Sequence, residues 1–132
     1  MTRFYGIDQA NARLRELAPL LRRLKADRDT VAEAQRDLVR FRATNGSSHH
    51  AQDLEQREAR LRDLVSRMER SVAQIVAWDV TLRDIETGLV DFPALVNGRQ
   101  VCLCWRLGEA AVEWWHELDL GFAGRKPLIE LG

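Results

Sequence analysis

The stretch GLVDFPALVNGRQVCLCWRLGE, residues 88–109, predicts a β-hairpin. Two apolar runs flank the dipeptide Asn97-Gly98, which favours a type I′ turn because both turn positions need a positive φ angle. If the residues on either side of this turn face each other, Asp91 lies opposite Cys104 on the neighbouring strand. We therefore expect the two runs to pair as antiparallel strands.

A second turn at Gly108-Glu109 extends this hairpin to a small three-stranded antiparallel β-meander. Side chains alternate between the two faces of a sheet, and we take the second turn to have an even number of residues. The packed, apolar face then carries Val90, Phe92, Ala94, Val101, Leu103, Trp105, Val112, Trp114 and His116. The outer face carries Asp91, Cys102, Cys104, Arg106, Glu113 and Trp115. This assignment places His116 on the opposite face from Asp91 and Cys104.

Upstream of the hairpin, apolar residues recur at heptad spacing in two long segments. They predict two helices joined by a polar loop, and Gly88 is expected to end the second helix. The expected single domain, residues 1–132, comprises helix 1 (8–42), a loop (43–50), helix 2 (51–86), the meander (88–118) and a C-terminal tail (119–132).

The two predicted helices have similar lengths, which favours a long antiparallel hairpin with coiled-coil-like packing. With the turn centred in the polar loop, Leu21 should lie near Ile75 and Leu24 near Val72. The predicted fold class is therefore α+β, with the two-helix hairpin followed by the three-stranded meander.

Composition and charge narrow the range of partners. Twenty basic residues balance twenty acidic residues, so we expect no nucleic acid and no anionic membrane surface as partner. No apolar run approaches the roughly 20 residues of a membrane helix. Cys102 and Cys104 stand too close in one strand for an unstrained mutual disulfide, which favours a reducing, cytoplasmic location.

With WWHELDLGFAGRKP, residues 114–127, the hairpin stretch resembles the C-terminal signature of the bacterial family known as domain of unknown function 2203. IDQANARLRELAPLL, residues 7–21, resembles the N-terminal helix of that family. The resemblance implies a compact bacterial protein with a long helical pair and a small β element, and it implies no activity. The recurrent polar positions of the family fall on Asp91, Cys104, Glu109, His116 and Arg125.

A ligand site, if present, is expected on the outer face of the meander and at its edge. The candidate ligand-binding residues are Asp91, Cys104, Arg106, Glu109, Glu113 and Arg125. Thiol and carboxylate groups are metal-ligand types, but paired spacings such as Cys-x-x-Cys are absent, so we expect no metal and no cofactor. Packed thiols and an ion pair between Asp91 and Arg106 are the simpler interpretation, with His116 bonded to a backbone partner.

The helical hairpin leaves an apolar flank, marked by Leu64, Trp78 and Ile85, that something else must cover. We therefore expect a homodimer and, as the first function hypothesis, a structural or interaction protein with a possible protein partner. The second hypothesis is a small enzyme or a metal- or anion-binding protein that uses the outer face of the meander. Whether the chain is an enzyme stays open.

Overall fold

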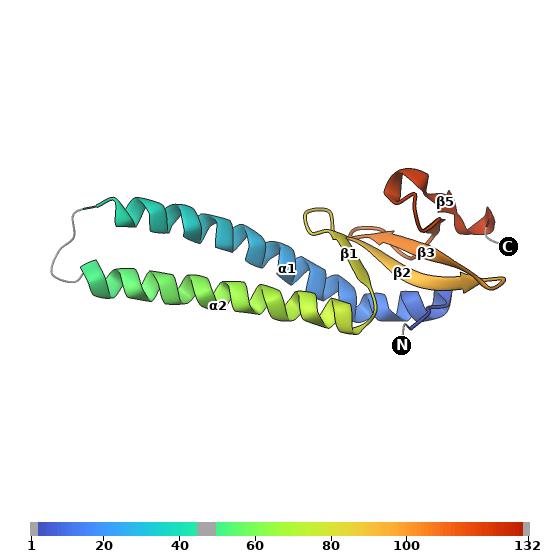
Figure 1. Ribbon diagram of the computed structural model, residues 1–132, viewed down its shortest axis with the longest axis horizontal. Coiled ribbons are helices and arrows are strands. Elements are labelled where there is room, and N and C mark those ends of the chain that lie inside the picture. The colour runs from blue at the N-terminus through green and yellow to red at the C-terminus, as the bar shows by residue number, and fades with distance from the viewer. Residues whose placement is uncertain (1–2, 45–49, 131–132) are drawn as a thin grey trace.

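The computed structural model describes residues 3–44 and 50–130 of the chain. Two long antiparallel helices are followed by a five-stranded antiparallel sheet whose strands neighbour one another in sequence order (Figure 1). The helices are α1 (Ile7–Arg42) and α2 (His50–Ala77), and the strands are β1 (Thr81–Asp84), β2 (Leu89–Val96), β3 (Arg99–Arg106), β4 (Trp114–His116) and β5 (Lys126–Pro127). The α+β class is confirmed, but the sheet has two more strands than the predicted meander. Most of the predicted loop, residues 45–49, lies outside the described residues.

The second helix is shorter than predicted. It ends at Ala77, and Asp79 takes a positive φ angle of 61°, which breaks the helical path. Leu82 continues the heptad pattern in the sequence, yet it lies in β1 and pairs with Val90 of β2. Pairing with the sheet and burial against the core outweigh the weak local preference for helix at this segment.

Gly88 lies in the turn between β1 and β2 and not at a helix end as predicted. Its φ angle is 67°, and an added Cβ atom would lie 2.6 Å from the Cβ atom of Leu107. The turn therefore uses glycine both for its left-handed backbone conformation and for the close approach of a neighbouring side chain.

The predicted hairpin of β2 and β3 is confirmed. Asn97 and Gly98 have φ angles of 53° and 76°, as a type I′ turn requires. The strands pair in the predicted register along their whole length, with Asp91 opposite Cys104.

The predicted face assignment is wrong for β4. The connection between β3 and β4 has an odd number of residues, and the register pairs Cys102 with His116. Because side chains alternate along a strand, the odd connection exchanges the two faces of β4 relative to the prediction. His116 therefore shares a face with Asp91 and Cys104, and Trp115 faces the helices.

The hydrophobic core lies where one face of the sheet packs on the N-terminal half of α1 and the C-terminal end of α2 (Figure 1). Its buried members are Tyr5, Ala10, Leu17, Leu20, Leu21, Leu24, Ile75, Val80, Val90, Phe92, Ala94, Val101, Leu103, Trp105, Val112 and Trp115. The Tyr5 hydroxyl donates to the carbonyl oxygen of Trp78 at 2.6 Å, and its ring meets the ring of Phe92 edge to face. These contacts anchor the segment that precedes α1 to the sheet.

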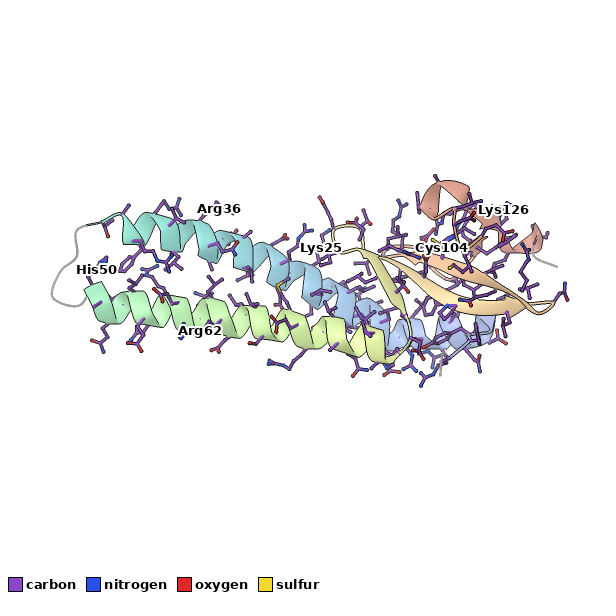
Figure 2. All side chains as sticks on the ribbon, viewed as in Figure 1. Lys25, Arg36, His50, Arg62, Cys104 and Lys126 are labelled. Carbon is purple, nitrogen blue, oxygen red and sulfur yellow. The ribbon has the colours of Figure 1, made fainter. Side chains whose placement is uncertain are left out.

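The rest of the helical hairpin extends beyond the sheet as an arm, which carries Arg36 and Arg62 (Figure 2). We define the hairpin arm as residues 25–44 and 50–73. Ion pairs that link its two helices are Asp27–Arg67, Asp37–Arg57 and Arg42–Glu58. Neither described helix is long and apolar enough to cross a lipid bilayer.

The apolar flank predicted to need a second copy, marked by Leu64, Trp78 and Ile85, is largely covered by other parts of the same chain. Leu64 is buried, and Trp78 and Ile85 pack against the core. A different apolar depression lies between the two helices, which we call the hairpin groove. It is lined by Val31, Val65, Met68, Glu69, Val72 and Ala73.

Candidate functional site

One carboxylate, two thiols and one imidazole are buried on the sheet face that points away from the helices. Asp91 comes from β2, Cys102 and Cys104 from β3, and His116 from β4, and each is less than 7% exposed. In the predicted meander this is the outer face. The C-terminal segment packs over it (Figure 1), so the polar row of Asp91, Cys102, Cys104 and His116 lies between two layers of the protein.

Asp91 is held through both of its carboxylate oxygens. Arg83 donates from Nε to Oδ2 at 2.6 Å, and His116 Nε2 lies 2.8 Å from Oδ1. Arg83 belongs to β1 and is about half exposed, so it links the buried carboxylate to the solvent. The predicted ion pair between Asp91 and Arg106 is wrong, since Arg83 takes that place.

His116 has an acceptor next to each ring nitrogen. Nδ1 donates to the carbonyl oxygen of Glu117 at 2.6 Å, because a carbonyl can only accept. The contact between Nε2 and Asp91 then needs a second proton, either on the ring or on the carboxyl group. The backbone partner expected for His116 is confirmed, and the ring also reaches into the polar row.

The Cys104 thiol completes a cluster with these two residues. The Sγ atom of Cys104, an oxygen of Asp91 and a ring nitrogen of His116 all lie within 4.8 Å of one another. Burial raises the pKa of the Cys104 thiol to about 11, although the nearby Arg125 guanidinium acts in the opposite direction. Burial also raises the pKa of Cys102, and both thiols are free. Neither thiol therefore has the lowered pKa of a nucleophilic cysteine.

Arg125 and Glu109 fasten the C-terminal segment beside the cluster. Arg125 donates to Glu109 Oε1 at 2.5 Å, and the same oxygen accepts the backbone N–H of Arg106 at 2.7 Å. The Arg125 guanidinium also lies over the rings of Trp114 and Phe122, 5.1 and 4.6 Å from their centroids. This ion pair ties the loop after β3 to the segment that covers the polar row.

The structure gathers only part of the predicted ligand set. Asp91 and Cys104 meet in the cluster, and Glu109 with Arg125 lies next to it. The Arg106 side chain is exposed and lies over the ring of Phe122, and Glu113 is exposed before β4. Neither residue joins the cluster.

Two members of the site, His116 and Arg83, are not where the sequence predicts them. His116 was assigned to the wrong face because the connection before β4 was taken as even. Arg83 was placed in the second helix, where it had no reason to meet Asp91. The signal that could have located Arg83 is the segment Thr81–Asp84, whose alternating pattern also suits a short strand.

Comparison with known proteins gives a family and no function. A family model described as "Uncharacterized conserved protein (DUF2203)" matches residues 3–128. No curated protein and no solved structure matches the chain.

Proposed function

We propose that this chain, which belongs to the DUF2203 family of uncharacterised conserved proteins, is a structural or interaction protein that pairs with a second copy of itself through the hairpin arm. The hairpin groove is the observation that carries the proposal. Val31 of α1 and Val65 and Val72 of α2 line an apolar strip that straddles both helices. Apolar surface of this kind usually marks a contact.

The second copy is the favoured occupant because of the geometry of the arm. Two helices form a single layer, which can bury only the side chains that point between them. Two such hairpins that pack groove to groove form a four-helix arrangement, the common way to bury an apolar strip shared by two antiparallel helices. The heptad spacing in both helices supports coiled-coil-like packing in that arrangement.

The molar mass in solution tests this proposal. We expect light scattering to give twice the chain mass of 15.2 kDa at micromolar concentration. Val65→Lys places a charge in the groove and should give the monomer mass, whereas Val76→Lys is the matched control. Val76 lies on the same helix, is 63% exposed and does not line the groove. A mass of 15.2 kDa for the unmodified chain at tens of micromolar would refute the dimer.

We also propose that the protein works in the cytoplasm. Cys102 and Cys104 are both free, and free thiols persist in compartments that keep cysteine reduced.

A small enzyme or an anion- or metal-binding protein is the second candidate function. Its support is the convergence of Asp91, Cys104 and His116 from three strands, with Arg125 beside them. The raised pKa of Cys104 argues against a cysteine nucleophile, so a binding role has more support than catalysis.

A further inference from the structure

We propose that Asp91, Cys104 and His116 form a binding site for one divalent transition-metal ion, with zinc as the best match. The three ligand atoms lie within 4.8 Å of one another, and each of the three residues is at most 2% exposed. Imidazole, thiolate and carboxylate are the three side-chain ligand types that zinc accepts. The inference does not depend on the dimer, because the site lies in the sheet and not in the hairpin arm.

The neighbours of the cluster orient its ligand atoms inwards. A metal-binding histidine usually donates its other ring N–H to a carbonyl or carboxylate, which fixes the ring. His116 has this arrangement, since Nδ1 donates to the Glu117 carbonyl and Nε2 points to the cluster. Arg83 holds Oδ2 of Asp91 in the same way and leaves Oδ1 facing inwards. Each of these two ligands therefore has one atom fixed by a neighbour and one atom directed at the site.

The charges of the ligands balance a divalent ion. Ionised Asp91 and a Cys104 thiolate contribute two negative charges, and neutral His116 contributes none, so a bound ion of charge +2 leaves the trio neutral. The ion would also replace the second proton that the contact between His116 Nε2 and Asp91 Oδ1 otherwise needs. Charge balance matters here because an unpaired charge in a buried site is costly.

The ligand atoms lie within 4.8 Å of one another, so shifts of about an ångström or less bring them to the spacing of tetrahedral ligands. Metal–ligand distances of 2.0–2.3 Å place tetrahedral ligand atoms roughly 3.3–3.8 Å apart. The 2.8 Å separation of Nε2 and Oδ1 is shorter than this range, so these two atoms must move apart by about half an ångström. The described residues bring three ligands to this point, and a water or a small anion would complete the tetrahedron.

The sequence contains no metal-binding motif because the three proposed ligands come from separate strands. Paired spacings mark sites built within one turn or one helix, whereas β2, β3 and β4 each supply one ligand here. The competing explanation is a structural hydrogen-bond network of Arg83, Asp91 and His116. That network keeps Cys104 as a neutral thiol beside Asp91, whereas a metal would bind it as a thiolate, so the state of this sulfur distinguishes the two explanations.

Cobalt spectroscopy on the full chain, purified without a histidine tag, is the direct test. Metal is first removed with a chelator under reducing conditions, and Co²⁺ is then added stepwise. We expect a thiolate-to-cobalt charge-transfer band in the near ultraviolet and tetrahedral visible bands, both saturating at one equivalent. Zinc should displace the cobalt and abolish both sets of bands.

The Cys102→Ala variant assigns the thiolate without altering the proposed ligands. Its only remaining thiol is Cys104, so the charge-transfer band should persist with the same stoichiometry. Cys104→Ala should lose the band and bind zinc on the order of 100-fold more weakly or worse, with the fold checked by circular dichroism. Absence of a thiolate band from the Cys102→Ala chain would overturn the proposal, even if Cys104→Ala fails to fold. Cobalt binding well below one equivalent in the unmodified chain would overturn it as well.

Discussion

At the scale of single residues, Asp91 has more partners than its sequence context indicates. Its place on the outer face of a predicted strand suggests an ion pair with Arg106 or contact with a ligand. The structure buries it to 2% exposure and gives it two cationic or proton-donating partners, Arg83 and His116. The Asp91 carboxylate therefore stabilises the fold through Arg83 and His116, whether or not its inward oxygen also binds an ion.

Asp91→Asn should lower the free energy of unfolding by about 2 to 4 kcal/mol, because a neutral amide replaces the carboxyl group that binds both Arg83 and His116. The value lies below that of a fully buried pair, since Arg83 is about half exposed to solvent. Urea denaturation measures it, with Asp119→Asn as a control on an exposed carboxylate. A loss below 1 kcal/mol would mean that neighbours other than this carboxylate hold Arg83 and His116 in place.

A large loss of stability from Asp91→Asn would not exclude a ligand site. Arg83 occupies only Oδ2, and Oδ1 remains directed at His116 and Cys104. Stability alone therefore cannot separate the two roles, and the thiol of Cys104 becomes the decisive group.

At the scale of secondary-structure elements, the features that could be predicted are those that depend on residues close together in the sequence. The Asn97-Gly98 dipeptide fixes one turn and, through it, the pairing of β2 with β3, including Asp91 opposite Cys104. The heptads of both helices likewise mark their apolar faces. The prediction of the β2–β3 hairpin is confirmed because one dipeptide determines both its turn and its register.

The wrong predictions concern segments whose structure depends on contacts with residues far away in the sequence. Leu82 fits a helical heptad as well as a strand, and only the presence of β2 beside it selects the strand. The loop before β4 carries no dipeptide that specifies its length, so the face of His116 could not be assigned. The candidate site was therefore half predicted: Asp91 and Cys104 came from the first turn, while His116 and Arg83 depended on the loop and on β1.

The turn between β1 and β2 offers a test at this scale. Gly88→Ala should destabilise the protein by about 2 to 4 kcal/mol, because positive φ strain adds to a clash with Leu107. Gly98→Ala is the matched control: its φ angle is also positive, but the space around an added Cβ is open. It should cost only about 1 to 2 kcal/mol, the strain alone.

Thermal unfolding of the two variants measures the difference. In a double-mutant cycle, Leu107→Gly should offset part of the stability lost in Gly88→Ala, since it removes the Cβ atom that lies 2.6 Å from the new methyl group. Equal losses for the two glycine variants would show that the close approach of Leu107 contributes nothing.

At the scale of the whole molecule, stabilising contacts are unevenly distributed. The buried core joins the sheet to α1 as far as Leu24 and to the end of α2, and the hairpin arm lies outside it (Figure 1). Within the arm, the Asp27–Arg67 pair is its one described ion pair with a buried carboxylate. The arm therefore relies on contacts between two helices, whereas the sheet region has three layers.

Hydrogen exchange should follow this distribution. Amides of β2, β3 and the N-terminal half of α1 should be protected most strongly, and protection should decline along the arm from Asp27 outwards. If the groove pairs two copies, amides around Val65 should gain protection as the protein concentration rises, while those of β3 should not change. Mass spectrometry after deuterium labelling measures both effects, and uniform protection along α1 would contradict the expected gradient.

The bonds that join the first turns of α1 to the sheet also bear on how the chain is made. The Asn11 side chain accepts the backbone N–H of Val112 at 2.8 Å, and the backbone N–H of Tyr5 donates to the Pro93 carbonyl at the same distance. A ribosome therefore releases the start of α1 long before its partners exist. The two helices can meet early because they are adjacent in sequence, whereas the start of α1 must keep its apolar side unpartnered until β2 and β3 have emerged. The start of α1 is therefore synthesised before the sheet but is among the last segments to reach its final contacts.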